Sequence, residues 1–326
     1  MKKVSVIMPM YNVENIMSRS VQSLFSQTLS DFEVIFVDDC STDNTNEELR
    51  KIIIDIKRED IAIQVIRHEY NMGVAVARNT GLNHASGEYI YYVDADDYIE
   101  PVTLEKLYNK AQEFDADIVG CEWFLTFQNN ERFMKQAHVS TGDELFTKMA
   151  HGVMRWNLWL FLVKRSLYET NGFRFIEKLN MGEDMMVMMK LALHANQVEI
   201  IHEPLYHYIQ TNSGSLTKNF SAYRYQVTGN VEELGYYLEK IGRKDMINAF
   251  MQLKLTLKLP LLISDKVDDY KTWYQWFPEA NDFVEENKDI PWRTRFIQVA
   301  ASKQQYWILK LYYWLVIKVV YGIIYK

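Results

Sequence analysis

Residues 88–97, EYIYYVDADD, place three carboxylates within four residues, directly after a short apolar run. The run is aromatic and β-branched, as is typical of a buried strand. Carboxylates crowded at a strand end repel one another, so a bound divalent cation would offset their charge. An acidic loop that caps the helix after Pro101 is the alternative, and this stretch alone does not decide between the two.

The sequence before this stretch alternates between apolar runs and helical patterns. Strands are predicted at residues 3–8, 32–37, 61–66 and 88–93, and helices at 13–27, 43–57 and 73–85. Strand–helix alternation predicts an α/β fold with right-handed crossovers and a mostly parallel sheet. Ligands bind beyond the carboxyl ends of such strands. This rule places one functional rim at residues 9–12, 38–43, 67–73 and 94–98.

The rest of the chain changes from mixed to helical. An antiparallel pair is predicted at 123–128 and 133–139, helices at 143–150, 164–170 and 183–195, and strands at 198–202 and 205–210. Helices at 221–263, 267–286 and 291–325 follow, with prolines as breaks. We therefore expect a catalytic domain at 1–217 and a helical C-terminal region at 218–326.

Composition excludes several classes of protein. The 326 residues are 48% hydrophobic and 24% charged, which is ordinary for a folded chain. The net charge of −7 argues against nucleic-acid binding. Two cysteines, Cys40 and Cys121, form no disulfide framework and no zinc site, and so suit a reducing compartment. The N-terminus does not read as a signal peptide, and no run of apolar residues is long enough to force a transmembrane helix.

Three further motifs carry polar chemistry. Residues 37–43, VDDCSTD, put two carboxylates after a strand, where one could accept from a nucleobase N–H. Residues 71–73, NMG, precede a helix in which Arg78 could reach an anion, although a surface ion pair is the simpler explanation. Residues 182–184, GED, begin a Met-rich helix and alone would be helix caps.

Together these motifs resemble the inverting family 2 glycosyltransferases of the GT-A fold. Similar segments are residues 6–12, 37–43, 71–73, 77–79, 94–97, 182–184 and 204–208, covering roughly residues 1–217. Residues 172–175, GFRF, are similar to bacterial capsular-polysaccharide and O-antigen members. The stretch 209–214 lacks the arginines that many relatives carry there, so a basic clamp is not expected from it.

The resemblance implies a role for each matching residue. Asp184 would be the general base, Asp39 would read the uracil, and Asp96 would bind Mn²⁺ or Mg²⁺. Asp97 and His207 are further candidate metal ligands, although a lone histidine among tyrosines is more often a hydrogen-bonded core residue. The expected donor-binding residues are Pro9, Tyr11, Asn12, Asp39, Asn71, Arg78 and Asp94.

The implied activity is metal-assisted single displacement from a UDP-sugar to a hydroxyl of a glycan or lipid-linked saccharide in bacterial surface-polysaccharide synthesis. A non-catalytic nucleotide-sugar-binding or assembly subunit and a nucleotidyltransferase are the alternatives. No G-x-G-x-x-G follows the first strand, so a dinucleotide dehydrogenase is excluded. The sequence leaves the sugar, the acceptor and any homo-oligomer open.

The C-terminal segment 303–326 has its own pattern. On a helix, Lys303, Lys310 and Lys318 lie near one face, where Trp307 and Trp314 also repeat at seven-residue spacing, continued by Tyr321. Lysines and aromatics beside a wide apolar face are typical of a helix lying in a membrane interface. We therefore expect a cytoplasmic protein held peripherally at the inner face of the membrane. Packing against the catalytic domain or a second subunit is the alternative.

Overall fold

The computed structural model describes residues 2–56, 58–210 and 220–316. These residues form two compact units, and the chain passes between them more than once. Unit 1 contains Met1–Leu145 and Arg155–Leu234, and unit 2 contains Phe146–Met154 and Gly235–Lys326. The expected domain boundary at 217 lies outside the described residues.

The N-terminal half of unit 1 is a parallel sheet. Its strands are β1 (Val4–Met10), β2 (Glu33–Asp38), β3 (Ala62–Arg67) and β4 (Tyr89–Tyr92), in the order β3-β2-β1-β4. They alternate with α1 (Met17–Phe25), α2 (Thr45–Asp55) and α3 (Val74–His84). Nearly all residues of β1, β2 and β4 are buried, as their apolar sequences require. The predicted α/β alternation is confirmed.

The sheet continues with strands of mixed direction. β8 (Phe161–Lys164) pairs antiparallel with β4 and with β6 (Ile118–Thr126), and β6 pairs parallel with β9 (Val198–Ile209). The edge strands β5 (Tyr98–Ile99) and β7 (Glu131–Met134) pair antiparallel with β9 and β6. The predicted hairpin around residues 129–130 is confirmed. No strand is predicted from the sequence at β5 or β8, and β9 is predicted as two separate strands.

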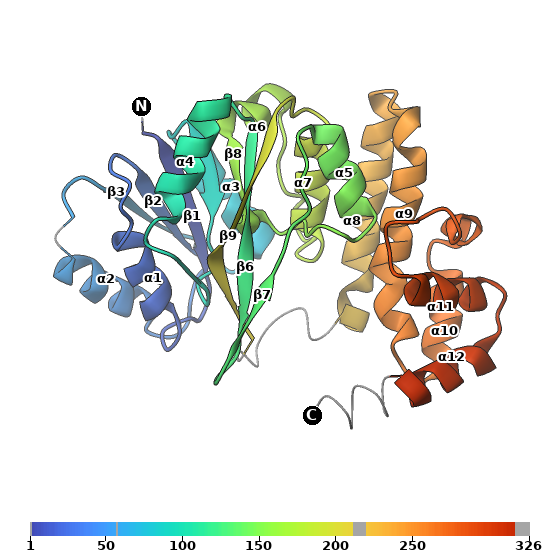
Figure 1. Ribbon diagram of the computed structural model, residues 1–326. Coiled ribbons are helices and arrows are strands. Elements are labelled where there is room, and N and C mark those ends of the chain that lie inside the picture. The colour runs from blue at the N-terminus through green and yellow to red at the C-terminus, as the bar shows by residue number, and fades with distance from the viewer. Residues whose placement is uncertain (1, 57, 211–219, 317–326) are drawn as a thin grey trace. The chain divides into compact units, whose positions relative to one another are not determined.

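Helices flank this sheet (Figure 1). They are α4 (Thr103–Phe114), α6 (Arg165–Asn171) and α7 (Glu183–Ala192), with a 3-10 turn η1 (Leu158–Leu160) before β8. The helix α5 (Gly142–Ala150) begins in unit 1 and ends in unit 2. The four methionines of α7 are completely buried, so this Met-rich helix is core. That packing holds the N-terminus of α7, where Glu183 and Asp184 lie, at a fixed place.

Unit 2 is helical, as predicted, but its helices are shorter than the sequence suggested. They are α8 (Phe220–Lys240), which begins in unit 1, α9 (Ile247–Lys258), α10 (Val267–Gln275), α11 (Trp292–Ser302) and α12 (Tyr306–Tyr312), with short turns η3 (Lys244–Met246), η4 (Leu259–Leu262) and η5 (Pro278–Phe283).

Two residues with positive φ explain the breaks. The predicted helix 221–263 is interrupted where Gly242 has a φ of 72°, and 291–325 is interrupted where Gln304 has a φ of 54°. None of the described helices is long and apolar enough to cross a membrane. Lys318 and Tyr321 of the expected amphipathic helix lie outside the described residues.

A short segment from the middle of the chain, Phe146–Met154, packs into unit 2. The Thr256 hydroxyl donates to the carbonyl of Ala150 at 2.8 Å. Lys148 Nζ and His151 Nδ1 lie 3.0 and 2.9 Å from the carboxylate of Asp289. The apolar members of the segment, Phe146 and Met149, are completely buried. Unit 2 is therefore built from two stretches that are far apart in sequence.

Candidate active site

The carboxyl ends of β2, β1 and β4 lie side by side, because these strands are parallel neighbours. β1 pairs with β4 only as far as Ile7, which aligns with Tyr92. Pro9, which has no N–H, therefore lies beyond the end of that ladder. The chain then leaves the sheet at Tyr11, which is 46% exposed and offers an aromatic face at the rim. The rim expected from the sequence thus exists in the fold.

Asn12 connects the β1 end to the β2 end. Its φ of 51° is left-handed, a conformation that Asn tolerates better than most residues. The Asn12 side-chain oxygen accepts from the Thr42 N–H at 2.8 Å, and its own N–H donates to the Ser41 hydroxyl at 3.0 Å. Asn12 therefore fixes the loop 38–43 against the β1 end.

Asp39 connects the β2 end to the loop before α3. One carboxylate oxygen accepts from the Met72 N–H at 2.8 Å and lies 2.7 Å from His68 Nδ1, and the other accepts from the Gly73 N–H at 2.7 Å. The side chain is almost completely buried, whereas Asn71 beside it is exposed. Asp39 thus holds the loop that presents Asn71 at the rim.

Gly73 occupies a position that only glycine fits. Its φ of 90° with a ψ of 162° lies in a region that residues with a Cβ avoid. A Cβ there would lie 2.3 Å from the Asn180 side-chain nitrogen. The Asn180 side-chain oxygen in turn accepts from the Ala75 N–H at 3.1 Å. The start of α3 is therefore clamped between Asp39 and Asn180.

Arg78 on α3 joins the β4 end to the N-terminus of α7. The guanidinium donates to Glu183, and to Asp94 at 3.3 Å, and it is only 6% exposed. Burial opposes its charge, but the carboxylates of Glu183, Asp94 and Asp184 outweigh that effect and raise the pKa of Arg78. Arg78 is therefore a permanent cation among three carboxylates, held by two of them.

Asp184 lies in the first turn of α7. The residue before this helix, Gly182, has a φ of 78°. One carboxylate oxygen accepts from the Met185 N–H at 2.7 Å, and the other accepts from the side-chain amide of Asn157 at 3.2 Å. Burial, followed by the charge of Glu183, raises the pKa of Asp184 to about 7, although Arg78 opposes this. A carboxylate with this pKa can take up and release a proton near neutral pH.

The acidic loop after β4 divides into two parts. Asp97 is buried, and it accepts from the Ile209 N–H at 2.7 Å and from the Tyr206 hydroxyl at 2.8 Å. Burial and the neighbouring carboxylates raise its pKa well above the usual range. These bonds fix β9 beside the loop, so they favour a structural role for Asp97 over the metal role considered from the sequence.

Asp94 and Asp96 are half-buried and provide the oxygen donors of this loop. Burial raises the pKa of Asp94, with Arg78 opposing the rise. Carboxylate oxygens suit Mg²⁺ or Mn²⁺, and such sites commonly use one or two carboxylates together with substrate phosphates. Across the part of the chain that the structure describes, no group of three or more His, Cys, Asp or Glu residues could hold a metal ion. The residues present therefore fit a cation only if a substrate supplies further ligands.

His207 on β9 is surrounded by protein groups. Its ring stacks on Tyr98, with centroids 4.1 Å apart. Nε2 lies 2.8 Å from Glu100, and Nδ1 lies 2.9 Å from Glu131. With both ring nitrogens within hydrogen-bond distance of carboxylates, the arrangement favours the hydrogen-bonded core role over metal binding.

The sequence did not indicate several residues that organise this site. They are His68, Asn157, Asn180, Glu183 and Tyr206, which contact Asp39, Asp184, Ala75, Arg78 and Asp97 respectively. Glu183 and Tyr206 lay in the family-like segments 182–184 and 204–208, and His68 lay in the predicted rim, but none of the three was given a role at the site. Asn157 and Asn180 lie in segments with no local signal of function, so only the fold brings them to the site.

Comparison with known proteins shows the family to which this chain is similar. Residues 5–177, more than half of the chain, match the family described as Glycosyl transferase family 2. The uncharacterized glycosyltransferase EpsJ of Bacillus subtilis is 34% identical over 222 residues. The poly(ribitol-phosphate) beta-N-acetylglucosaminyltransferase TarS of Staphylococcus aureus is 28% identical over 295 residues. These matches cover 66% and 87% of this chain, but only 63% of EpsJ and 50% of TarS, so the chain spans less than two thirds of either relative.

Two solved structures share the fold. TarS residues 1–349 in complex with UDP-GlcNAc superpose with a TM-score of 0.62 at 21% identity, covering 95% of this chain and 91% of that one. The Pyrobaculum calidifontis mannosyltransferase PcManGT, in complex with GDP-Man and Mn²⁺, gives a TM-score of 0.54 at 19% identity, covering 94% of this chain and 87% of that one. The expected GT-A fold is confirmed. On its sequence match and its fold, the chain belongs to glycosyl transferase family 2.

Proposed function

We propose that this chain is an inverting glycosyltransferase that moves a sugar from a nucleoside-diphosphate sugar to an acceptor hydroxyl, with Asp184 as the general base. The observation that carries the proposal is the state of Asp184. It lies at a helix N-terminus, it is oriented by Asn157, and its pKa is raised to about 7. Carboxylates with a strongly raised pKa and a fixed orientation cluster at functional sites.

The chemical step uses this carboxylate directly. Asp184 takes the proton of the acceptor hydroxyl while the hydroxyl oxygen forms its bond to the anomeric carbon. The bond from that carbon to the diphosphate breaks on the opposite face, so the nucleoside diphosphate leaves and the anomeric centre inverts. The raised pKa of Asp184 lets this carboxylate both take up and release a proton near neutral pH.

The donor proposed first is a UDP-sugar. Support comes from the relative TarS, whose structure has been solved in complex with UDP-GlcNAc. In this chain, the rim formed by Pro9, Tyr11 and Asn12 would hold the nucleoside, with Asp39 and Asn71 beside it. Asp39 already accepts from protein N–H groups, so its proposed contact with the uracil would use a remaining lone pair.

Asp94 and Asp96 are the residues proposed to hold a divalent cation together with the donor phosphates. Mn²⁺ in the PcManGT complex supports the choice of metal. When bound, the cation would neutralise negative charge that develops on the departing diphosphate. Arg78 holds Asp94 in place through its hydrogen bond, and its expected contact with the pyrophosphate stays a prediction.

The acceptor proposed is a glycan or lipid-linked saccharide of a bacterial surface polysaccharide, made at the cytoplasmic face of the membrane. The relative TarS, a poly(ribitol-phosphate) beta-N-acetylglucosaminyltransferase, supports a polymer acceptor. The raised pKa of Asp184 favours catalysis over a non-catalytic subunit, and family membership favours sugar transfer over nucleotidyl transfer. A homo-oligomer remains open.

The first test replaces the proposed base. Asp184→Asn should lower sugar transfer by about 10²–10⁴-fold, the usual contribution of a general base. Donor affinity, measured by calorimetry, should stay within a few-fold of wild type. The matched control is Asp268→Asn, which changes an exposed carboxylate in the first turn of α10 and should leave transfer unchanged. Transfer by Asp184→Asn at the rate of the control would refute the base assignment.

A second test measures donor binding separately from catalysis. A panel of UDP- and GDP-sugars, each with and without Mn²⁺, should include one that raises thermal stability only with metal. A ligand at one hundred times its dissociation constant adds about 2.7 kcal/mol of stability. Asp96→Ala should abolish that stabilisation, whereas Asp55→Ala, at an exposed position in the same unit, should preserve it. A stabilisation that survives in Asp96→Ala would remove this residue from the cation site.

A further inference from the structure

The end of the chain differs in charge from the rest of the protein. From residue 290 to 326 there are six basic residues and no aspartate or glutamate, although the whole chain has a net charge of −7. Arg293, Lys303 and Lys310 are exposed in the structure. A basic, acid-free segment on an acidic protein concentrates positive potential in one region, and such a region attracts anionic surfaces.

One face of α12 and of the residues that continue it is buried. Another face is exposed although its side chains are apolar. Leu309 is completely buried, whereas Trp307, Leu311, Trp314 and Leu315 are 69%, 49%, 58% and 45% exposed. Their spacing of four, three and one residues places these four side chains on one helical face. An exposed face with two tryptophans and two leucines is unusual for a protein surrounded only by water.

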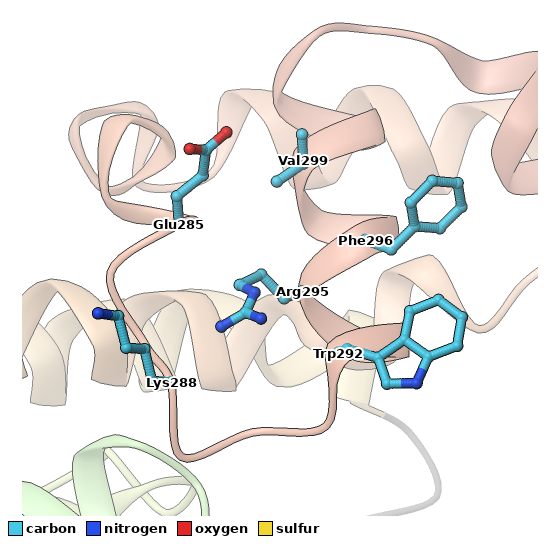
Figure 2. Close-up of a pocket in the computed structure, with 6 residues that line it drawn as sticks. All are labelled: Glu285, Lys288, Trp292, Arg295, Phe296 and Val299. Atoms are coloured by element: carbon cyan, nitrogen blue, oxygen red, sulfur yellow. The ribbon is translucent and has the colours of Figure 1, made fainter.

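α11 adds two aromatics to the same unit. It buries Ile297, Ala300 and Ala301 but leaves Trp292 66% and Phe296 45% exposed. Figure 2 shows Trp292 and Phe296 projecting on the same side of α11, while Arg295 projects toward the loop that carries Glu285 and Lys288. A cavity of about 620 Å³ lies here, lined by these five residues and Val299. Aromatic side chains next to cations are the combination enriched at the lipid–water interface.

We infer that the exposed faces of α11 and α12 form a docking surface for an anionic lipid bilayer, on which both helices lie in the interface without crossing it. The surface extends the helix 303–326 expected from the sequence to Trp292 and Phe296. Trp and Leu side chains enter the headgroup region, and Arg293, Lys303 and Lys310 stay at the level of the lipid phosphates. The inference does not depend on the proposed sugar transfer.

The charges argue against a second copy of this chain as the occupant. A two-fold contact through α12 would bring Lys303 and Lys310 of both copies to one interface. No acidic residue lies between positions 290 and 326 to compensate them, and Glu285, which lines the cavity beside α11, shares that cavity with Lys288 and Arg295. Like charges brought together in this way oppose association. An anionic bilayer supplies the missing negative charge.

Co-sedimentation of the full chain with lipid vesicles tests the inference. The protein should bind vesicles that contain about one third phosphatidylglycerol and should not bind pure phosphatidylcholine, because juxtaposed lysines and arginines are attracted by anionic headgroups. Raising the salt concentration should weaken the binding, since screening acts on exposed charges. Binding to neither vesicle, or equal binding to both, overturns the inference.

Matched variants assign the binding to this surface. Lys303→Gln with Lys310→Gln should weaken binding to the anionic vesicles about 25-fold, which is about 1 kcal/mol for each lysine. Trp307→Ser with Trp314→Ser should weaken it at least as strongly, and Trp292→Ser with Phe296→Ser should also weaken it. The control is Ile54→Ser with Tyr70→Ser, which removes two apolar side chains, 76% and 63% exposed, from unit 1 and should change nothing.

Two further readouts keep the result interpretable. All four double variants should unfold at the wild-type temperature, because the replaced side chains are exposed. Wild-type levels of binding by the tryptophan variant would overturn the inference. Light scattering that shows a dimer of the wild type, lost in the tryptophan variant, would assign the face to a second copy instead.

Discussion

At the residue scale, the site depends on pairs of groups that control one another's charge. Arg78 is held by Glu183 and Asp94, and Asp184 lies next to Glu183 at the start of α7. Glu183 therefore has two effects, since it anchors the buried guanidinium and raises the pKa of the adjacent Asp184. Burial raises the proton affinity of the proposed base most, and a neighbour that need not touch the substrate raises it further.

This arrangement predicts the pH dependence of transfer. Asp184 acts as a base only when it is deprotonated, so kcat/KM should rise with pH and level off above about 7. Glu183→Gln removes a charge that raises the pKa of Asp184, so the midpoint of this rise should move to lower pH. The pH–rate profiles of the two proteins measure the shift. A midpoint that stays in place or moves upward would contradict the electrostatic role of Glu183.

The same pKa predicts how stability changes with pH. The folded pKa of Asp184, about 7, lies above the usual aspartate value of 3.8, so the folded state holds this proton more tightly than the unfolded state does. The contribution of Asp184 to the free energy of unfolding is therefore greatest below about pH 4, and it is lost as the pH rises through about 7. Asp184→Asn should consequently be at least as stable as wild type at pH 8, as measured by urea unfolding. A marked loss of stability at that pH would mean that the ionised carboxylate stabilises the fold.

Gly73 gives a second test at this scale. Gly73→Ala forces a side chain into a glycine-only conformation and against Asn180, at a cost of about 1–3 kcal/mol from the backbone alone. Donor affinity should fall as well, because the Gly73 N–H anchors Asp39. Gly172→Ala is the control, since it also has positive φ but has no neighbouring atom within 4 Å. Equal effects of the two changes on donor affinity would show that the Gly73 contact is unimportant.

At the scale of elements, the prediction was best for the strands and helices that alternate regularly. Strands β1–β4 and the helices between them follow an alternating pattern, and the rim follows from that pattern by a general rule. β8 was missed because it continues an unbroken apolar run from Leu158, in which helix and strand have the same signature. β5 has only two residues, too few for any periodicity.

β9 shows why a proline misled the prediction. The sequence placed a break between residues 202 and 205, because proline cannot donate to a ladder. In the structure, Pro204 aligns with Glu122, where the register between β6 and β9 shifts. The irregularity removes the need for the missing N–H, so one strand of 12 residues passes through it. Tyr206 on this strand reaches Asp97, and Asn157 before β8 reaches Asp184, through contacts between segments far apart in sequence, so local patterns could not show them.

Lys258 allows a prediction about the connection between α10 and η5. Its completely buried ammonium donates to the carbonyls of Trp276 and Phe277, at 3.1 and 3.2 Å, and to Asn281. Phe277 has a left-handed φ of 53°, so this turn needs outside support. Lys258→Met should lower the free energy of unfolding by about 2–4 kcal/mol, because buried carbonyls lose their donor.

Urea unfolding, followed by circular dichroism, measures the effect of this change. The control, Lys266→Met, alters an exposed lysine in the same unit and should stay within about 0.5 kcal/mol of wild type. A loss for Lys258→Met no larger than that of the control would mean that the turn holds without the lysine.

At the scale of the whole molecule, the two units are not consecutive along the chain. Unit 1 is interrupted by Phe146–Met154, which belongs to unit 2. Within unit 2 this segment contributes Met149 and Ala150 to the core, and it bonds to Thr256 and Asp289. A family match that covers residues 5–177 therefore includes a piece of the other unit.

This interleaving predicts the behaviour of fragments. Residues 1–217, the catalytic domain expected from the sequence, would keep the segment but lose its packing partners in 235–326. The fragment should expose apolar side chains, bind a hydrophobic dye and aggregate at temperatures where the full chain stays soluble. The control is a chain ending at residue 316, which keeps every described element. A soluble fragment 1–217 with cooperative unfolding would show that the segment is dispensable.

Because unit 2 contains two separate stretches of the chain, its parts leave the ribosome at different times during synthesis. Phe146–Met154 emerges about one hundred residues before the stretch that contains Thr256 and Asp289. At translation speeds of about 5–20 residues per second, the partners of its apolar side chains are synthesised about 5–20 seconds later. During that interval the nascent chain carries an unfinished second core, and this is the period in which a chaperone would have most to protect.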